Sequence, residues 1–395
     1  MVRIFNDMIH QRMNYLLALC LLVQATISSL SAQQYDGDGI PAGIEEEIRW
    51  LVNRGRFDSA AENATQGTSY ADIPSTSSAL APNQLLTLAG RHHSEDMARN
   101  NAFQHETVPG STYYNSVTQP SPWDRMEAEG YNWSGAGENI AAGYTSALAV
   151  YVGWWKSTGH RINMYKASHR EIGNGHFEWA SSTYRNYYTM ELASSRNRNF
   201  LTGTLFNDSN GNNRYEPSEA ASDVRVSLMV NDTVYPQYDI STSVGNFAVP
   251  IQSIAKGTKV RVILSNTTNS IINLSIPTSY STFAPLRLTP GESMAYGQFT
   301  LESSENNVGL REITPIPQKP PLPALMASVS RLPSGVIDHF ILNFQSTNQE
   351  LYTLEHSTDA KSWQVLETGI IGNGNALTRI YPVIDTTEFF RLRRE

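Results

Sequence analysis

Six of the nine histidines of this 395-residue chain fall between Arg91 and Ala193, beside two short polar signatures. The signatures are Gly137-Glu138-Asn139-Ile140 and Ser157-Thr158-Gly159-His160-Arg161-Ile162-Asn163, and Phe103-Gln104-His105 precedes them. Imidazole and carboxylate groups suit zinc, and an open coordination position can bind a ligand oxygen or activate water. Spacing alone would reveal no site, because 33 and 22 residues separate His105, Glu138 and His160. Taken together, the segments are typical of a cation-binding cleft in a secreted domain.

A second set of ligand groups lies within twelve consecutive residues, 208–219. Oxygen-bearing side chains stand at positions 1, 3, 5, 9 and 12, and position 7 offers a backbone carbonyl, as in a calcium loop. These ligands are Asp208, Asn210, Asn212, the Arg214 carbonyl, Glu216 and Glu219. Asn213 replaces the usual glycine, and asparagine enters left-handed conformations readily. We expect a stabilising calcium here, with an unliganded polar turn as the alternative.

The N-terminus predicts export. Arg3 and Arg12 precede an apolar run, Tyr15 to Val23, and small residues close the segment at Ala32. The run is shorter than the roughly 20 residues that a spanning helix needs, so we expect a signal peptide over 1–32 and no transmembrane anchor in the mature form. Cys20, the only cysteine, lies inside it. The mature chain must therefore be stabilised by core burial or bound ions rather than by disulfides.

Composition excludes one class of partner. Residues 1–32 contain two arginines and one aspartate, so the remainder carries 27 basic and 36 acidic residues, a net charge of −9. Such a surface repels phosphate backbones, and no basic stripe with interleaved aromatics is present, so nucleic-acid binding is not expected. The 363 residues after the signal are too many for one ordinary core.

The elements expected to position the polar groups are three helices, followed along the chain by two strands. Apolar spacing predicts helices over 44–57, 83–101 and 147–155, with Thr145 or Ser146 as the N-cap of the last. A Gly/Pro/Asn-rich stretch between the second and third helices is expected to be loop. Two β-like runs follow, at 171–177 and 184–192. This predicts an α/β layered domain, which an N-terminal segment, 33–82, leads into. Within 35–46, Asp36, Asp38 and Glu45 have partial calcium-loop spacing, and a solvated acidic turn is the alternative.

Beyond residue 199 the pattern becomes all-β. Runs rich in β-branched and aromatic residues predict a β-sandwich over 200–303, which resembles the calcium-loop repeats of bacterial surface adhesins. A Pro-rich linker spans 304–326. Short strands return over 327–395, a small β domain that resembles a fibronectin-like module of exported bacterial proteins.

The ordered motifs of residues 83–194 resemble a known family. They are His92-His93-Ser94-Glu95-Asp96-Met97, Phe103-Gln104-His105, Gly130-Tyr131, Gly137-Glu138-Asn139-Ile140, Trp154, Gly159-His160-Arg161-Ile162-Asn163, Glu171-Ile172-Gly173 and Tyr187-Tyr188-Thr189. This set is similar to the bacterial branch of the CAP superfamily, or SCP domain, of cysteine-rich secretory, antigen 5 and pathogenesis-related 1 proteins. The resemblance implies an α-β-α sandwich with an open cleft, and the fold class α+β for the chain, followed by two all-β domains.

The resemblance also implies a site. In the family two histidines and two glutamates can hold a divalent cation, often zinc or magnesium. The motifs match His105, Glu138 and His160, while Ser157 stands where the second glutamate is usual. Three protein ligands and water would be the pattern of an open site. The alternative is that these polar groups tie loops together by hydrogen bonds.

Several neighbouring residues complete the expected cleft. Asn139, Trp154, Ser157 and Arg161 are predicted to contact a ligand in the cleft. Asn139 and Arg161 are also expected to cap or bridge the loops that carry Glu138 and His160. One of His92 and His93 is expected to face the core, and His169 and His176 to lie at the surface or the cleft rim. No catalytic residue is assigned, because residues 33–395 contain neither a Gly-x-Ser-x-Gly elbow nor a cysteine.

Three functions remain open on the sequence. The leading one is a secreted or cell-envelope protein whose cleft binds a divalent cation and an extracellular lipid, glycan or peptide. A second is a metal-dependent hydrolase of peptide or cell-wall material, which leaves enzymatic activity undecided. A third is a calcium-stabilised adhesin that attaches to cell-surface material.

Overall fold

The computed structural model describes residues 39–277, 283–303, 306–316, 324–335, 337–383 and 388–394. The predicted signal peptide, Asp36, Asp38 and most of the linker prolines lie outside the described residues. The chain divides into two compact units, residues 1–316 and 317–395. Among the described residues, no helix is both long enough and apolar enough to cross a membrane.

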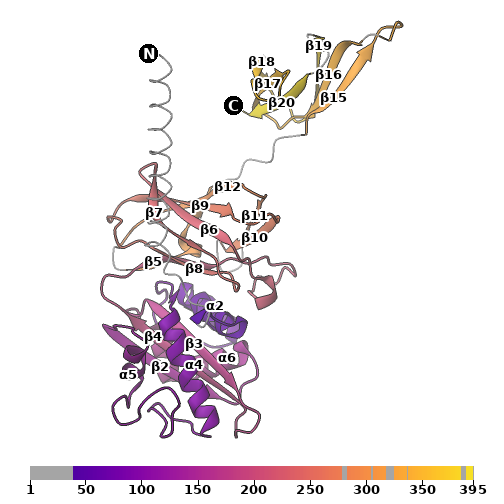
Figure 1. Cartoon of the computed structure of the whole chain (residues 1–395). Helices are drawn as coiled ribbons and strands as arrows, with labels where there is room; N and C mark the ends of the chain where they lie inside the picture. Colours follow the sequence, from indigo (N-terminus) through magenta and orange to yellow (C-terminus); the bar gives the residue numbers. More distant parts are fainter. Residues whose placement is uncertain are drawn as a thin grey trace, which may run out of the picture. The chain divides into compact units, whose positions relative to one another are not determined.

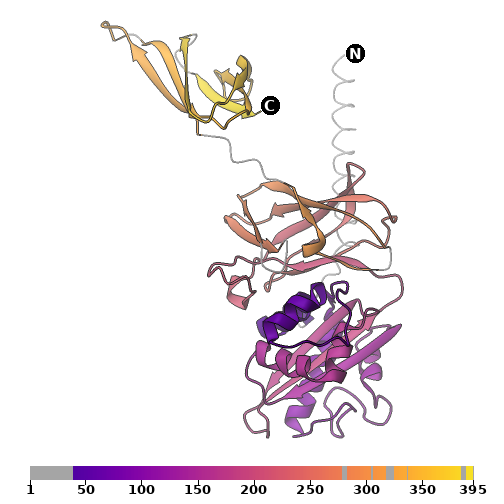
Figure 2. The same cartoon turned by 180° about the vertical axis from the view of Figure 1, so that it is seen from behind.

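The first part of unit 1 is a three-layer α-β-α sandwich. Its sheet has the strand order β1-β3-β4-β2, with β1 parallel to β3 and the other pairs antiparallel. Helix α4 packs against β3 and β4, and helices α2 and α6 lie on the other face (Figures 1 and 2). The elements are α2 (Gly43–Phe57), α3 (Ser59–Gln66), β1 (Ala81–Pro82), α4 (Gln84–Arg99), α5 (Pro122–Ala128), β2 (Gly135–Ala142), α6 (Ala147–Lys156), α7 (Thr158–Tyr165), β3 (Glu171–Glu178) and β4 (Asn186–Ser194).

Two glycines of β3 bring α4 close to the sheet. A Cβ added at Gly173 would lie 2.1 Å from the backbone nitrogen of Thr87, and one at Gly175 would lie 2.1 Å from that of Arg91. Because no larger residue fits at either position, the helix rests directly on the strand. The helix begins at Asn83, whose side chain accepts hydrogen bonds from two backbone N–H groups of the first turn.

The predicted α-β-α fold is confirmed, with one local error. The stretch between α4 and α6, expected to be loop, contains helix α5 and strand β2. The start of α5 had a readable signal, since Ser121 and Asp124 form a capping box and Pro122 occupies the first turn. Strand β2 had none, because Gly135–Ala142 is rich in glycine and alanine, which are poor strand formers.

The second part of unit 1 is a β-sandwich, as the sequence predicted. A five-stranded sheet, β14-β12-β9-β6-β7, and a three-stranded sheet, β13-β5-β8, enclose a core that includes residues of the β10-β11 hairpin. Its elements are β5 (Phe200–Thr204), η2 (Pro217–Glu219), β6 (Val224–Val230), β7 (Thr233–Ile240), β8 (Asn246–Pro250), β9 (Lys259–Asn266), β10 (Ile272–Pro277), β11 (Phe283–Leu288), β12 (Ser293–Thr300), β13 (Val308–Gly309), η3 (Leu310–Glu312) and β14 (Thr314–Pro315).

The two parts of unit 1 share buried contacts. The buried guanidinium of Arg49 on α2 donates to Glu46, to the carbonyl oxygen of Gly203 and to the hydroxyl of Thr204. Phe206 and Tyr215, from the sandwich side, belong to the core of the α-β-α part. The junction is therefore packed like a domain interior.

Unit 2 is a small β domain of two three-stranded sheets, β15-β16-β19 and β18-β17-β20, around one apolar core. Its strands are β15 (Met326–Arg331), β16 (Ile337–Gln345), β17 (Leu351–Ser357), β18 (Gln364–Ile371), β19 (Ala376–Pro382) and β20 (Phe389–Arg394).

Candidate functional site

Two of the three predicted cleft ligands contact each other. His105 lies in the loop after α4 and Glu138 on β2, and His105 Nδ1 is 2.6 Å from Glu138 Oε1. The Glu138 side chain is buried, whereas half of the His105 side chain is exposed. Since Nδ1 is used by Glu138, Nε2 is the ring nitrogen of His105 that can meet a ligand.

A buried arginine holds the other oxygen of Glu138. Arg125, on α5, donates from Nη2 to Glu138 Oε2 over 2.5 Å and from Nη1 to the carbonyl oxygen of His105 over 3.0 Å. One guanidinium thus fixes both members of the pair. Burial by itself would raise the pKa of Glu138, but the hydrogen bond with His105 and the charge of Arg125 outweigh it, so this pKa is lowered.

The pKa values of the two cleft histidines, His105 and His160, are shifted in opposite directions. The hydrogen bond to Glu138 raises the pKa of His105. Burial lowers the pKa of His160, and the positive charge of nearby His105 lowers it further. His160 on α7 is held indirectly, because Asn139 Nδ2 donates to its carbonyl oxygen over 3.1 Å. His105 therefore keeps its proton to a higher pH than His160 does.

The three predicted ligands do not form one coordination set. No group of three or more His, Cys, Asp or Glu side chains arranged to hold a metal occurs in the part of the chain that the structure describes. The structure joins His105 to Glu138 and brings His160 within electrostatic range of His105. Both carboxylate oxygens of Glu138 are already bonded within the protein, one to His105 and one to Arg125.

The other residues predicted around the ligand are mostly internal. Asn139, Trp154 and Arg161 are each at most 2 % exposed. The Trp154 indole donates to the Ile140 carbonyl oxygen, and Arg161 forms an ion pair with Asp72. Ser157 is half-buried at the start of α7 and makes no side-chain cap there. Asn139 and Arg161 thus bridge segments, and Trp154 anchors α6 to β2.

Among the remaining histidines, the structure contradicts the sequence prediction for one. His93 is buried and its Nε2 bonds to the Gln104 carbonyl oxygen, as expected for a core histidine. His176 is half-buried and stacks on Tyr188. The surface prediction for His169 is wrong. His169 is fully buried, and burial lowers its pKa to about 3.

Sequence reasoning missed two charged residues under the cleft, Arg125 and Glu191. Glu191 on β4 pairs in register with Glu138 on β2 and is fully buried. Burial, followed by the negative charge of Glu138, raises its pKa well above the usual value. A glutamate near the end of the predicted β run 184–192 was the available signal.

The loop 208–219 has its oxygens gathered around its own backbone. Both Asp208 oxygens accept backbone N–H groups, from Asn212 and Asn213, and Asn213 adopts a left-handed φ of 59°. Asn210 and Asn212 donate their amide groups to Glu216. The N–H of Arg214 donates to Asn212, and the Arg214 side chain pairs with Glu47 of α2.

Glu219 closes this loop. Its Oε1 accepts from Ser209, and its carboxyl lies within hydrogen-bonding reach of Glu216. Its Oε2 is buried with no hydrogen-bond donor within reach among the described residues. Two adjacent carboxylates, one with an unsatisfied buried oxygen, form a donor set that fits a calcium ion.

Known proteins match the first part of the chain. Residues 52–222 match the family model of the cysteine-rich secretory protein family, CAP. The uncharacterized protein YkwD of Bacillus subtilis is 35 % identical over 98 residues, which cover 25 % of this chain and 35 % of that protein. The uncharacterized membrane protein YlbC of the same organism is 36 % identical over 100 residues, 25 % of this chain and 24 % of YlbC.

A solved structure is also similar. It is an extracellular protein containing an SCP domain from Bacillus anthracis, with 25 % sequence identity and a TM-score of 0.28, covering 39 % of this chain and 41 % of that one. The chain thus spans a quarter to about two fifths of the length of these relatives. The family match includes the motifs around His105, Glu138 and His160, and we conclude that residues 52–222 of this chain contain a CAP domain.

Proposed function

We propose that the protein is secreted, and that its CAP cleft binds a divalent cation through the imidazoles of His105 and His160, beside an extracellular lipid, glycan or peptide. The observation that carries the proposal is the 2.6 Å contact between His105 Nδ1 and Glu138 Oε1. A metal-binding histidine commonly donates its second ring N–H to a carboxylate, which fixes the ring and makes it a better ligand.

This arrangement changes the role expected for Glu138. Because His105 and Arg125 occupy both of its oxygens, Glu138 supports a ligand rather than being one. Two imidazoles and water then remain as ligands, which suits zinc better than magnesium, since magnesium prefers oxygen ligands. A bound zinc would supply Lewis acidity and a position for a ligand oxygen.

The environment of His160 supports the proposal. The lowered pKa of His160 keeps its imidazole neutral, as a metal ligand must be. Asn139 ties the backbone of His160 to β2, the strand that carries Glu138. Glu138 and Asn139, neighbouring residues of β2, therefore hold the ring of His105 and the backbone of His160.

Calorimetric titration of the whole chain with zinc tests this site. We expect saturable binding that the double substitution His105→Ala/His160→Ala abolishes. The matched control is His339→Ala, since His339 is an exposed histidine of unit 2. Equal zinc uptake by the double variant and the control would refute the assigned ligands.

We also propose that loop 208–219 binds calcium and stabilises the β-sandwich, as the buried, unsatisfied Glu219 Oε2 supports. Secretion is supported by the apolar N-terminal segment and by the similarity to an extracellular Bacillus anthracis protein. A hydrolytic role gains less support, because a carboxylate with both oxygens engaged is poorly placed to act as a general base.

A further inference from the structure

A chain of three hydrogen bonds runs from a buried histidine to the cleft. His169, in the turn between α7 and β3, has its Nε2 3.3 Å from Asn163 Oδ1. Asn163 Nδ2 donates to Asn139 Oδ1 over 3.0 Å, and Asn139 Nδ2 donates to the carbonyl oxygen of His160 over 3.1 Å. The chain therefore ends on the backbone of a residue that we propose as a zinc ligand, although His169 has no part in that proposal.

The chemistry of the two ends fixes the direction of this chain. Burial, followed by the charge of Arg56, lowers the pKa of His169 to about 3, so at neutral pH its imidazole is uncharged and carries one N–H. His169 Nδ1 is buried and has no hydrogen-bond partner among the residues that the structure describes. A proton there would leave a buried donor unsatisfied, whereas a proton at Nε2 is donated to Asn163. Since the His160 carbonyl oxygen only accepts, each amide is held with its oxygen toward His169 and its nitrogen toward His160.

The two amides have little freedom to adopt another arrangement. A Cβ added at Gly137 would lie 2.1 Å from Asn163 Oδ1, so the Asn163 side chain rests directly on the backbone of β2. Asn139 is 1 % exposed and His169 is fully buried. Because water has poor access to these groups, a bond lost from the chain would leave a buried polar atom unsatisfied.

The turn that carries His160 depends on support from outside its helix. Helix α7 is eight residues long, and its N-cap residue Ser157 makes no side-chain hydrogen bond to the first turn. The first N–H groups of a helix have no partners within it, so a helix end without such a cap is less stable. The bond from Asn139 ties this turn to β2, the strand that also carries Glu138. The orientation of the His160 imidazole therefore depends on how firmly Asn139 is held.

We propose that His169 is a positioning residue of the cleft, whose Nε2–H group holds Asn163 and Asn139 and, through them, the backbone of His160. The inference rests on the zinc site proposed above, because zinc affinity reports where the His160 imidazole lies. His169 acts by donating a hydrogen bond and not only by filling space. A substitute that donates from the same place should therefore preserve the cleft, and an apolar substitute of similar size should not.

Calorimetric titration of the whole chain with zinc tests this role. His169→Leu should weaken zinc binding about tenfold or more, as expected for the loss of a residue that orients a metal ligand. His169→Gln offers an N–H group close to the position of Nε2 and should bind zinc within about threefold of the wild type. Equal losses in the two variants would show that His169 serves packing alone and would overturn the proposal.

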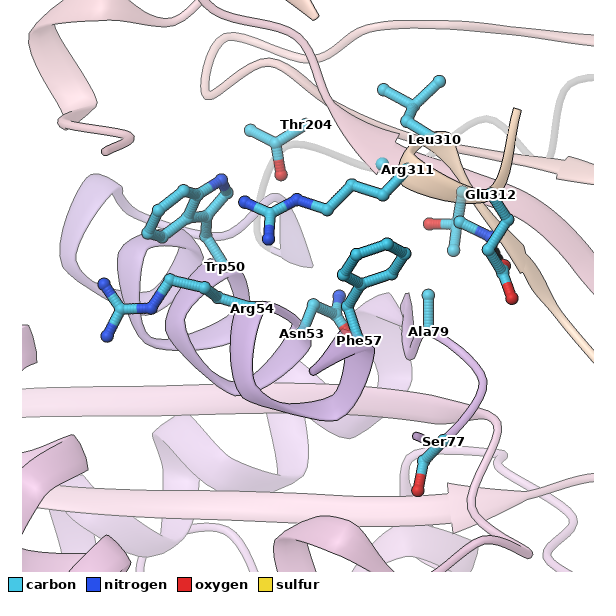
Figure 3. A pocket seen from close by; sticks show the side chains of 13 residues that line it. Trp50, Asn53, Arg54, Phe57, Ser77, Ala79, Thr204, Leu310, Arg311 and Glu312 are labelled. Atoms are coloured by element: carbon cyan, nitrogen blue, oxygen red, sulfur yellow. Dashed lines mark hydrogen bonds between the residues drawn. The ribbon is translucent and has the colours of Figure 1, made fainter. Parts of the chain in front are cut away.

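The matched control is Asn53→Leu, at a half-buried amide that is bonded at both ends by the backbone of Leu80. Figure 3 shows Asn53 on α2, lining a pocket where α2 meets the β-sandwich, and no residue of the hydrogen-bonded chain lines that pocket. Asn53→Leu should lower the melting temperature, as His169→Leu does, but should leave zinc affinity unchanged. Equal losses of zinc affinity in Asn53→Leu and His169→Leu would mean general destabilisation and would contradict the proposal.

Two NMR measurements on the metal-free protein do not depend on zinc. The long-range ¹H–¹⁵N spectrum of the wild type should show His169 as the Nε2–H tautomer, and the Nδ1–H tautomer would overturn the proposal even if His169→Leu failed to fold. The side-chain N–H groups of Asn139 should exchange with water several-fold faster in His169→Leu than in the wild type or His169→Gln. If the wild type took up no zinc, the proposed function would fail, and equal Asn139 exchange rates in all three proteins would refute the positioning role separately.

Discussion

The cleft and the loop 208–219 both gather carboxylate and nitrogen or amide groups, but they do so in different ways. The cleft groups come from the loop after α4, from β2 and from α7, and other parts of the domain hold them in place. The loop groups come from twelve consecutive residues and bond mainly to their own backbone. The fold therefore preorganises the cleft groups, whereas the loop groups are arranged locally, around the calcium ion that we propose for this loop.

The largest effect that would sharpen this contrast is expected from Arg125→Met. Removing the guanidinium leaves the buried Glu138 carboxylate without its cationic partner, which should lower the free energy of unfolding by about 3–5 kcal/mol. Urea unfolding measures this change. Arg185→Met, which breaks the exposed pair with Glu178, should cost below about 1 kcal/mol. Similar small losses in both variants would show that the cleft does not depend on this clamp.

The stability that the loop 208–219 provides should depend on a bound ion rather than on residues far away in the sequence. Calcium at about a hundred times its dissociation constant should stabilise the wild type by about 2.7 kcal/mol, measured as a rise in melting temperature. Asp208→Ala should abolish the rise, because the first ligand position is lost. Asp232→Asn, at an exposed aspartate of the same sandwich, should keep it. A melting temperature indifferent to calcium in all three proteins would leave the loop as a polar turn.

Glu138→Gln distinguishes a supporting residue from a ligand. If Glu138 only orients His105, zinc affinity should fall about 10–100-fold, which calorimetry measures. The matched control is Glu178→Gln, an exposed glutamate on β3. Complete loss of zinc binding by a variant that still melts like the wild type would make Glu138 a direct ligand.

Acidification should weaken zinc binding in the cleft but not calcium binding in the loop, and this effect should be the smallest of the four. His105 has a raised pKa, so protons compete with zinc for it already near neutral pH. Lowering the pH from about 7.5 to about 6.5 should weaken zinc binding by up to about tenfold. The pKa of Glu216 is lowered, since hydrogen bonds led by that from Asn212 outweigh its burial, so it stays ionised over this range. Calcium titrations at both pH values should therefore agree.

The same contrast explains what the sequence could predict. The calcium-type pattern was readable because its spacing is local, down to the left-handed Asn213. The cleft residues could be predicted only from the family motifs, because 55 residues separate His105 from His160. Arg125 was missed because its helix lies in a stretch whose composition predicts loop. Glu191 was missed because its role depends on its neighbour Glu138 on the adjacent strand, and strand pairing could not be predicted from the sequence. The burial of His169 was missed because it depends on tertiary packing around one end of β3.

Phe206 and Tyr215 lie in the core of the α-β-α part, although they follow its last strand in the chain. Truncation near residue 199 would strip two aromatic rings from that core and uncover the indole of Trp50. The CAP fold and the sandwich should consequently melt in a single cooperative transition, and an excised CAP fragment should be prone to aggregate.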